Sequence, residues 1–138
     1  MLSNHVWSTF HAAQERAIEA FSSAKHAEAA KADELDGLTL ERARERESRL
    51  AALDGSVAPA TLTLMDLIAR TLDNRIERVG RELAALTAEA DRRRVVLVAA
   101  TAQVKAIEKL DERRGEERSR IEGRAEQARL DEIRPRFA

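Results

Sequence analysis

The sequence predicts an all-α fold: an antiparallel two-helix coiled-coil hairpin in which the second helix is the longer. Apolar residues recur every three and four positions over residues 62–107, and a turn signal ending in Pro59 comes just before this stretch. The composition is 43% hydrophobic but only 3% aromatic and 36% charged, which is typical of long helices with narrow apolar seams. We expect the 138 residues to form a single domain.

The stretch 62–107 contains an uninterrupted seven-residue repeat. A straight helix drifts by about 20° per heptad against such a repeat, so the stripe faces one partner helix only if the two helices supercoil. The seam consists of Leu62, Met65, Ala69, Leu72, Ile76, Val79, Leu83, Leu86, Ala90, Arg93, Leu97, Ala100, Val104 and Ile107. Arg93 is its one polar member. We expect its guanidinium either to pair with Glu15 or Glu19, or to reach water while its stem lies along the seam.

The first helix is expected over about residues 4–53, with Ser3 or Asn4 as the cap that accepts a backbone hydrogen bond from the opening turn. Its seam begins with Trp7, Phe10, Gln14, Ala17, Phe21 and Ala24. Further along, the apolar signal thins to Leu35, Leu38, Leu40 and Ala43. The charged run 41–47 is expected to be a solvated face.

The chain is expected to reverse at residues 54–58. Proline cannot donate a backbone hydrogen bond and clashes with the carbonyl four residues earlier, so Pro59 cannot lie inside a helix. Pro59 or Ser56 therefore opens the second helix, expected over about residues 59–134. Gly37 costs about 1 kcal/mol within a helix and is expected to be a soft point rather than a turn.

A turn centred near residue 56 pairs residue n of the first helix with about residue 112 − n of the second. This pairing places Trp7, Phe10 and Phe21 opposite alanines, so that large side chains meet small ones. It also leaves the second helix without a partner beyond about residue 111, where the seam turns polar at Asp111, Arg114 and Arg118. Residues 111–136 are therefore expected to be a charged overhang.

The overhang and the hairpin tip contain the candidate partner-binding residues. In the overhang these are Arg113, Arg114, Arg118, Ile121, Leu130, Asp131 and Ile133, with Phe137 as a further apolar side chain. At the tip they are Leu64, Met65 and Ile68, which either bind a partner or help to close the turn. Val95, Val96 and Val98 lie off the seam; they either form a partner or self-association face or are covered by aromatic residues of the first helix.

No motif for catalysis is present. The chain has no cysteine, no tyrosine and no Gly-rich phosphate loop, so we expect neither enzyme activity nor a cofactor. His11 and Glu15 are one helical turn apart, but two ligands make a poor metal site and none is expected. The net charge of −1, with interleaved signs, argues against nucleic-acid binding. The start has no secretory signal and no apolar run reaches bilayer length, so a soluble, cytoplasmic protein is expected.

Two stretches near the end resemble the C-terminal signature of the FliJ family, the small stalk proteins of the flagellar type III export ATPase, and of their YscO-type injectisome counterparts. In that family a K-x-L-E-K-L-x-E-R-R stretch precedes a charged helix and an E-Q-K-x-L-D-E ending. The first is matched by Lys105, Glu108, Lys109, Leu110, Glu112, Arg113 and Arg114. The second is matched by Glu126, Gln127, Leu130, Asp131 and Glu132. Departures are Ile107 for Leu and Ala128 for Lys, and the first helix matches only in general character.

The resemblance implies a non-enzymatic coiled-coil stalk and chaperone of a type III protein export apparatus, either flagellar or of an injectisome. It implies binding to the hexameric export ATPase, to the export gate protein and to export chaperones, at the cytoplasmic side of the inner-membrane apparatus. The residues alone leave open another function, a structural or adaptor coiled coil unrelated to export. We expect a monomer or a weak homodimer with no direct membrane insertion.

Overall fold

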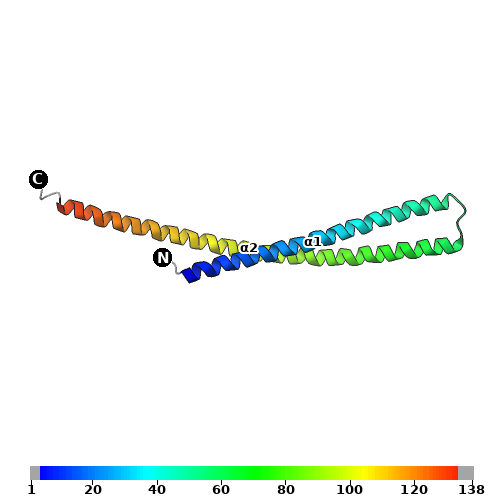
Figure 1. The fold of residues 1–138 in the computed structure, drawn as a ribbon, viewed down its shortest axis with the longest axis horizontal. Coiled ribbons are helices and arrows are strands. Elements are labelled where there is room, and N and C mark those ends of the chain that lie inside the picture. Colours follow the sequence, from blue (N-terminus) through cyan, green and yellow to red (C-terminus); the bar gives the residue numbers. More distant parts are fainter. Residues whose placement is uncertain (1–3, 134–138) are drawn as a thin grey trace. The chain divides into compact units, whose positions relative to one another are not determined.

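The computed structural model describes residues 4–133, which form two helices, α1 (Asn4–Leu53) and α2 (Pro59–Ile133) (Figure 1). The predicted all-α antiparallel hairpin with a longer second helix is confirmed. Within it, residues 4–18 and 96–133 form one compact unit, and residues 19–95 form another. The predicted cap Ser3 and the apolar residue Phe137 lie outside the described residues.

The turn between the helices occupies residues 54–58. At its start the Gly55 N–H donates a hydrogen bond to the Ala52 carbonyl over 3.2 Å. At its end the Ala58 carbonyl accepts bonds from the amides of Thr61 and Leu62. Pro59 is the first helical residue, where a missing N–H leaves no helix bond unmade.

The register of the hairpin in residues 19–95 follows from three ion pairs between the helices: Lys31 with Glu82, Arg42 with Asp73 and Arg49 with Asp66. In these pairs the two residue numbers add up to 113 or 115, so residue n of α1 lies opposite about residue 114 − n of α2. The predicted register of 112 − n was wrong by about two residues.

This register is set by the packing of the two seams against each other and not by the midpoint of the turn. Two antiparallel helices pack in layers, and each layer needs a seam residue from both. A pairing of n with about 114 − n brings Ala52 level with Leu62 and Leu38 level with Ile76, whereas the predicted register would have set seam residues against flanking ones. The same shift brings Phe21 level with Arg93, so the expected match of large side chains with alanines was also wrong there.

The apolar core of residues 19–95 is a cluster of Leu38, Leu72 and Val79, against which Leu35 and Ile76 pack. Val79 is fully buried. In the other unit Ala17, Ala100 and Val104 are buried, and the Gln14 amide donates to the Thr101 hydroxyl over 3.4 Å. The predicted seam of α2 is thus buried or half-buried throughout, except at Arg93.

Charged residues occupy part of the seam of α1, which the sequence analysis missed. Half-buried charged residues of α1 are Glu28, Lys31, Arg42, Glu45 and Arg49. Together with Leu35 and Leu38 they form two rows at steps of seven, 28–35–42–49 and 31–38–45. The interpretation of residues 41–47 as a solvated face is therefore wrong for two of them, since the Arg42 and Glu45 side chains are 16% and 10% exposed. Leu40, expected as part of the apolar signal, is 52% exposed instead.

Candidate functional site

The described residues contain no group of three side chains suited to a metal ion. His11 lies with its ring centroid 4.8 Å from that of Trp7, so this imidazole belongs to the packing at the start of α1. None of the helices in residues 4–133 has a stretch long and apolar enough to cross a bilayer. The predicted site residues lie on the exposed overhang and around the hairpin tip.

The overhang of α2 is the segment beyond the residues that lie level with Asn4, the first described residue of α1. In this unit Gln14 contacts Thr101, so Asn4 comes level with about residue 111. From residue 112 to residue 133 all residues of α2 are exposed except Gly115, which is half-buried. The predicted site residues of the overhang all lie in this exposed segment: Arg113, Arg114, Arg118, Ile121, Leu130, Asp131 and Ile133.

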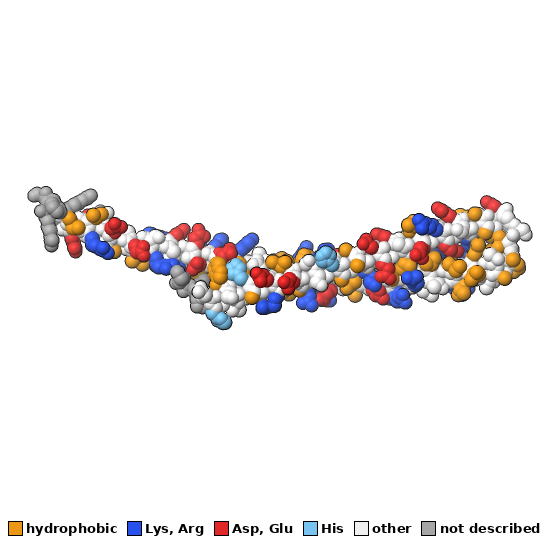
Figure 2. Space-filling view, in the orientation of Figure 1, with side chains coloured by type: hydrophobic (Ala, Val, Ile, Leu, Met, Phe, Trp, Pro, Cys, Tyr) orange, Lys and Arg blue, Asp and Glu red, His pale blue; other side chains and the backbone are white. Residues whose placement is uncertain are grey.

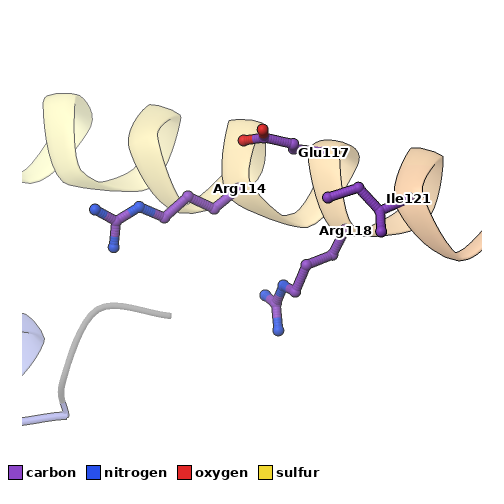
Figure 3. A pocket seen from close by; sticks show the side chains of 4 residues that line it. All are labelled: Arg114, Glu117, Arg118 and Ile121. Atoms are coloured by element: carbon purple, nitrogen blue, oxygen red, sulfur yellow. The ribbon is translucent and has the colours of Figure 1, made fainter.

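One face of the overhang carries a shallow hollow lined by Arg114, Glu117, Arg118 and Ile121. Figure 3 shows Arg114 and Arg118 extending from one edge of α2, while Glu117 lies along the opposite edge. Ile121 is 58% exposed. Within residues 4–133, no ion pair reaches either arginine. The hollow therefore combines unpaired positive charge with an apolar side chain.

The sequence of the overhang does little to stabilise an isolated helix. Like charges four residues apart, as at Arg114 and Arg118, destabilise a helix by about 0.2–0.5 kcal/mol. Gly115 and Gly123 each cost about 1 kcal/mol relative to alanine, and a methyl group at either position would meet nothing within 4 Å. Neither glycine is therefore required by packing in this chain.

The hairpin tip presents exposed apolar residues on both helices. On α2, Leu64 is 56% and Ile68 44% exposed, while Met65 is half-buried in the seam. Leu50 and Leu53 of α1 are also exposed, although neither was predicted as a partner-binding residue. Figure 2 shows hydrophobic side chains gathered on both helices around the turn. The sequence could have indicated Leu50 and Leu53 as exposed, because both lie beside the turn at positions off the seam.

The valines that follow Arg94 are also uncovered. Val95, Val96 and Val98 are 67%, 55% and 63% exposed, so the expectation that aromatic residues cover them was wrong. Val98 lines a hollow together with Leu97, Thr101, Ala102 and Lys105.

Arg93 does not pair with Glu19, the predicted partner that lies in the same unit. Its Nε donates to Glu89 Oε1 over 2.7 Å, one turn earlier on the same helix, and its side chain is 50% exposed. Hydrogen bonds from Arg92 and then Arg93 lower the pKa of Glu89. The Arg93 side chain also lines a hollow in the seam, formed where Ala24 meets Leu86. The predicted pairing with Glu19 is therefore wrong, and the half-exposed guanidinium pairs within α2 instead.

Two comparisons with known proteins give no match: no curated protein and no solved structure is significantly similar to the chain. The third is positive, because the family model described as "Flagellar FliJ protein" matches residues 9–136. The match covers both helices and the overhang.

Proposed function

Because the chain belongs to the flagellar FliJ family, we propose that it is the non-enzymatic coiled-coil stalk of the flagellar export apparatus and binds the hexameric export ATPase. Family membership assigns the chain to flagellar protein export. The proposal adds its partners: the ATPase ring, the export gate protein and export chaperones. It also places the protein in the cytoplasm, at the periphery of the inner-membrane apparatus.

The observation that supports this proposal most is the overhang, a charged segment of α2 without a partner helix. It contributes almost no buried surface to the hairpin, yet it contains Ile121, Leu130 and Ile133, each about half exposed. Full burial of such a side chain in a groove contributes about 1.5–3 kcal/mol. We assign the contact with the ATPase to this segment, with Arg113, Arg114, Arg118 and Asp131 as its polar residues.

The hairpin tip is the second surface of the proposal. Leu64 and Ile68 expose apolar surface on α2, and Met65 lies beside them in the seam. Exposed apolar residues that are grouped in this way mark sites of protein interaction. We assign the tip to a further protein of the same apparatus.

A self-associating structural coiled coil is the second candidate function. The observation that favours it is the exposure of Val96 and Val98, two β-branched residues on a helix surface. Such a protein would form homodimers and would show no affinity for the export ATPase.

Co-purification of the full chain with the purified export ATPase separates the two functions. The stalk is expected to bind the ring and to raise its rate of ATP hydrolysis, and charge reversal at Arg113, Arg114 and Arg118 should weaken the binding more at low salt than at high salt, because exposed charges are screened. A chain that dimerises and leaves both binding and hydrolysis unchanged would support the adaptor function instead.

A further inference from the structure

The seam of α2 does not stop where α1 stops. Beyond Ile107 the steps of four and three residues continue through Asp111, Arg114, Arg118, Ile121, Ala125, Ala128 and Glu132. Side chains at this spacing lie on one face of a supercoiled helix. In the unit of residues 4–18 and 96–133, this face of the overhang continues the face that packs against α1.

The structure shows what a partner helix does to residues on this face. Where α1 is present, Ala100 and Val104 are 8% and 4% exposed. Where α1 is absent, Ala125 and Ala128 are exposed although they hold equivalent seam positions. The overhang thus provides one helix of a coiled coil. Its seam continues the heptad positions of the preceding segment, in which α1 provides the second helix.

We propose that the overhang completes this coiled coil with an acidic amphipathic helix of its partner, which lies where α1 would lie if it continued beyond Asn4. This inference deepens the proposed function and rests on it, because it names the kind of element that the overhang binds. The partner helix has large apolar residues facing Ile121, Ala125 and Ala128, and carboxylates facing Arg114 and Arg118.

The acidic character follows from the two arginines. Arg114 and Arg118 lie one turn apart on the seam face, and neither forms an ion pair within the described residues. Their mutual repulsion disfavours the free helix. Carboxylates on an incoming helix would remove this repulsion and accept charge-assisted hydrogen bonds from both guanidinium groups.

Ala125 and Ala128 indicate the size of the side chains that the partner helix places opposite them. Small seam residues leave room for large side chains from the opposite helix, because coiled-coil layers pack at the density of a protein interior. Leucine or phenylalanine in the partner would therefore fit against Ala125 and Ala128. Leu130 lies off this seam and does not contribute to it.

A second copy of this overhang is a poorer occupant. Parallel pairing of two copies sets each seam residue against its own equivalent, which brings Arg114 against Arg114 and Arg118 against Arg118. Antiparallel pairing that sets Ile121 against Ala125 also sets Glu122 against Glu122 and Arg124 against Arg124 beside the seam. Both arrangements therefore place like charges together, which destabilises a helix pair.

The test uses the full chain and a designed helical peptide of about three heptads, with leucine facing Ile121, Ala125 and Ala128 and glutamate facing Arg114 and Arg118. Fluorescence anisotropy measures the affinity. The double variant Arg114→Glu, Arg118→Glu is expected to lower it by about tenfold or more, and a lysine version of the peptide should restore it. The matched control is Lys109→Glu, Arg120→Glu, which makes the same charge change at exposed positions off the seam and should leave the affinity unchanged.

Equal effects of the two double variants, or no binding of the glutamate peptide to the full chain, would overturn the inference. Binding of the full chain to the purified export ATPase is measured on the same samples. If the chain binds the ATPase but not the peptide, the inference that the overhang binds a helix is overturned and the proposed function is not. A chain that binds the peptide with the expected dependence on the seam arginines, but not the ATPase, overturns the proposed function and supports the seam.

Discussion

Leu38 is the side chain of α1 on which the core of residues 19–95 most depends. It is 3% exposed and packs in the cluster with Leu72 and Val79. Leu38→Ala is expected to lower the free energy of unfolding by about 2–5 kcal/mol, because it removes buried apolar atoms and leaves a cavity. Leu40→Ala is the matched control: Leu40 is 52% exposed, so its change should be about 0.5 kcal/mol or less. Denaturation by urea, followed by circular dichroism, measures both.

The ionisation of Asp73 makes the stability of the hairpin depend on pH. Hydrogen bonding to Arg42 lowers the pKa of Asp73 below its usual 3.8, and Arg46 adds a smaller effect. A carboxylate whose pKa is lowered by folding stabilises the folded state above its unfolded pKa and loses that contribution as the pH falls toward the folded value. Asp73→Asn should therefore lower the melting temperature at neutral pH and reduce its further fall below about pH 4. Parallel melting curves for the variant and the unaltered chain at all pH values would contradict this.

Arg93 contributes little to the fold, because its only ion pair within residues 4–133 is with Glu89 on the same exposed helix face. Such a pair on an exposed helix face adds little to stability, because water screens the two charges. Arg93→Leu is expected to leave the melting temperature unchanged or to raise it, since leucine can fill the hollow beside Ala24 and Leu86. A loss of several kcal/mol in the free energy of unfolding would show that Arg93 makes a contact this account lacks.

Charged residues at seam positions of α1 are the part of the hairpin that could not be predicted from the sequence. The apolar seam of α2 was predicted in full, because thirteen of its fourteen members are hydrophobic and the heptad is visible. In α1 the same heptad passes through Lys31, Arg42 and Arg49, whose long stems occupy seam positions while their charged ends pair across the hairpin. A pattern of hydrophobicity alone cannot reveal such positions.

At the scale of elements, unequal helix lengths led to the correct prediction of an overhang. Helix α1 has 50 residues and α2 has 75, so α2 must continue alone whatever the exact register. The register itself was predictable: the seams align only at pairings seven residues apart, and of these 114 − n is the one nearest to a turn at residues 54–58. The partner of the overhang was not predictable from periodicity, because exposed mixed charges fit more than one protein.

The overhang should be dispensable for the fold. Residues 112–133 bury almost nothing, so deleting residues 112–138 is expected to leave the melting temperature of the hairpin nearly unchanged. The helical signal in circular dichroism should fall only by the share of the residues removed. A large drop in melting temperature on deletion would mean that the overhang packs against the hairpin in solution.

At the scale of the whole molecule, the two candidate surfaces differ in chemistry. The overhang combines unpaired arginines with separated apolar residues, whereas the tip exposes leucines on both helices and has Met65 in its seam. The two surfaces share no residue, so under the proposed function each is expected to bind its own partner. The tip would then retain its partner after the overhang is deleted.

The affinity of the export ATPase for the full chain and for residues 1–111 tests the central claim most directly. Isothermal titration with the purified hexameric ATPase is expected to show binding of the full chain and none of the shortened chain, whose unchanged melting temperature shows that its hairpin is intact. Undiminished affinity of the shortened chain would contradict the account and would place the contact in the hairpin, with the tip around Met65 and Ile68 as the next surface to examine.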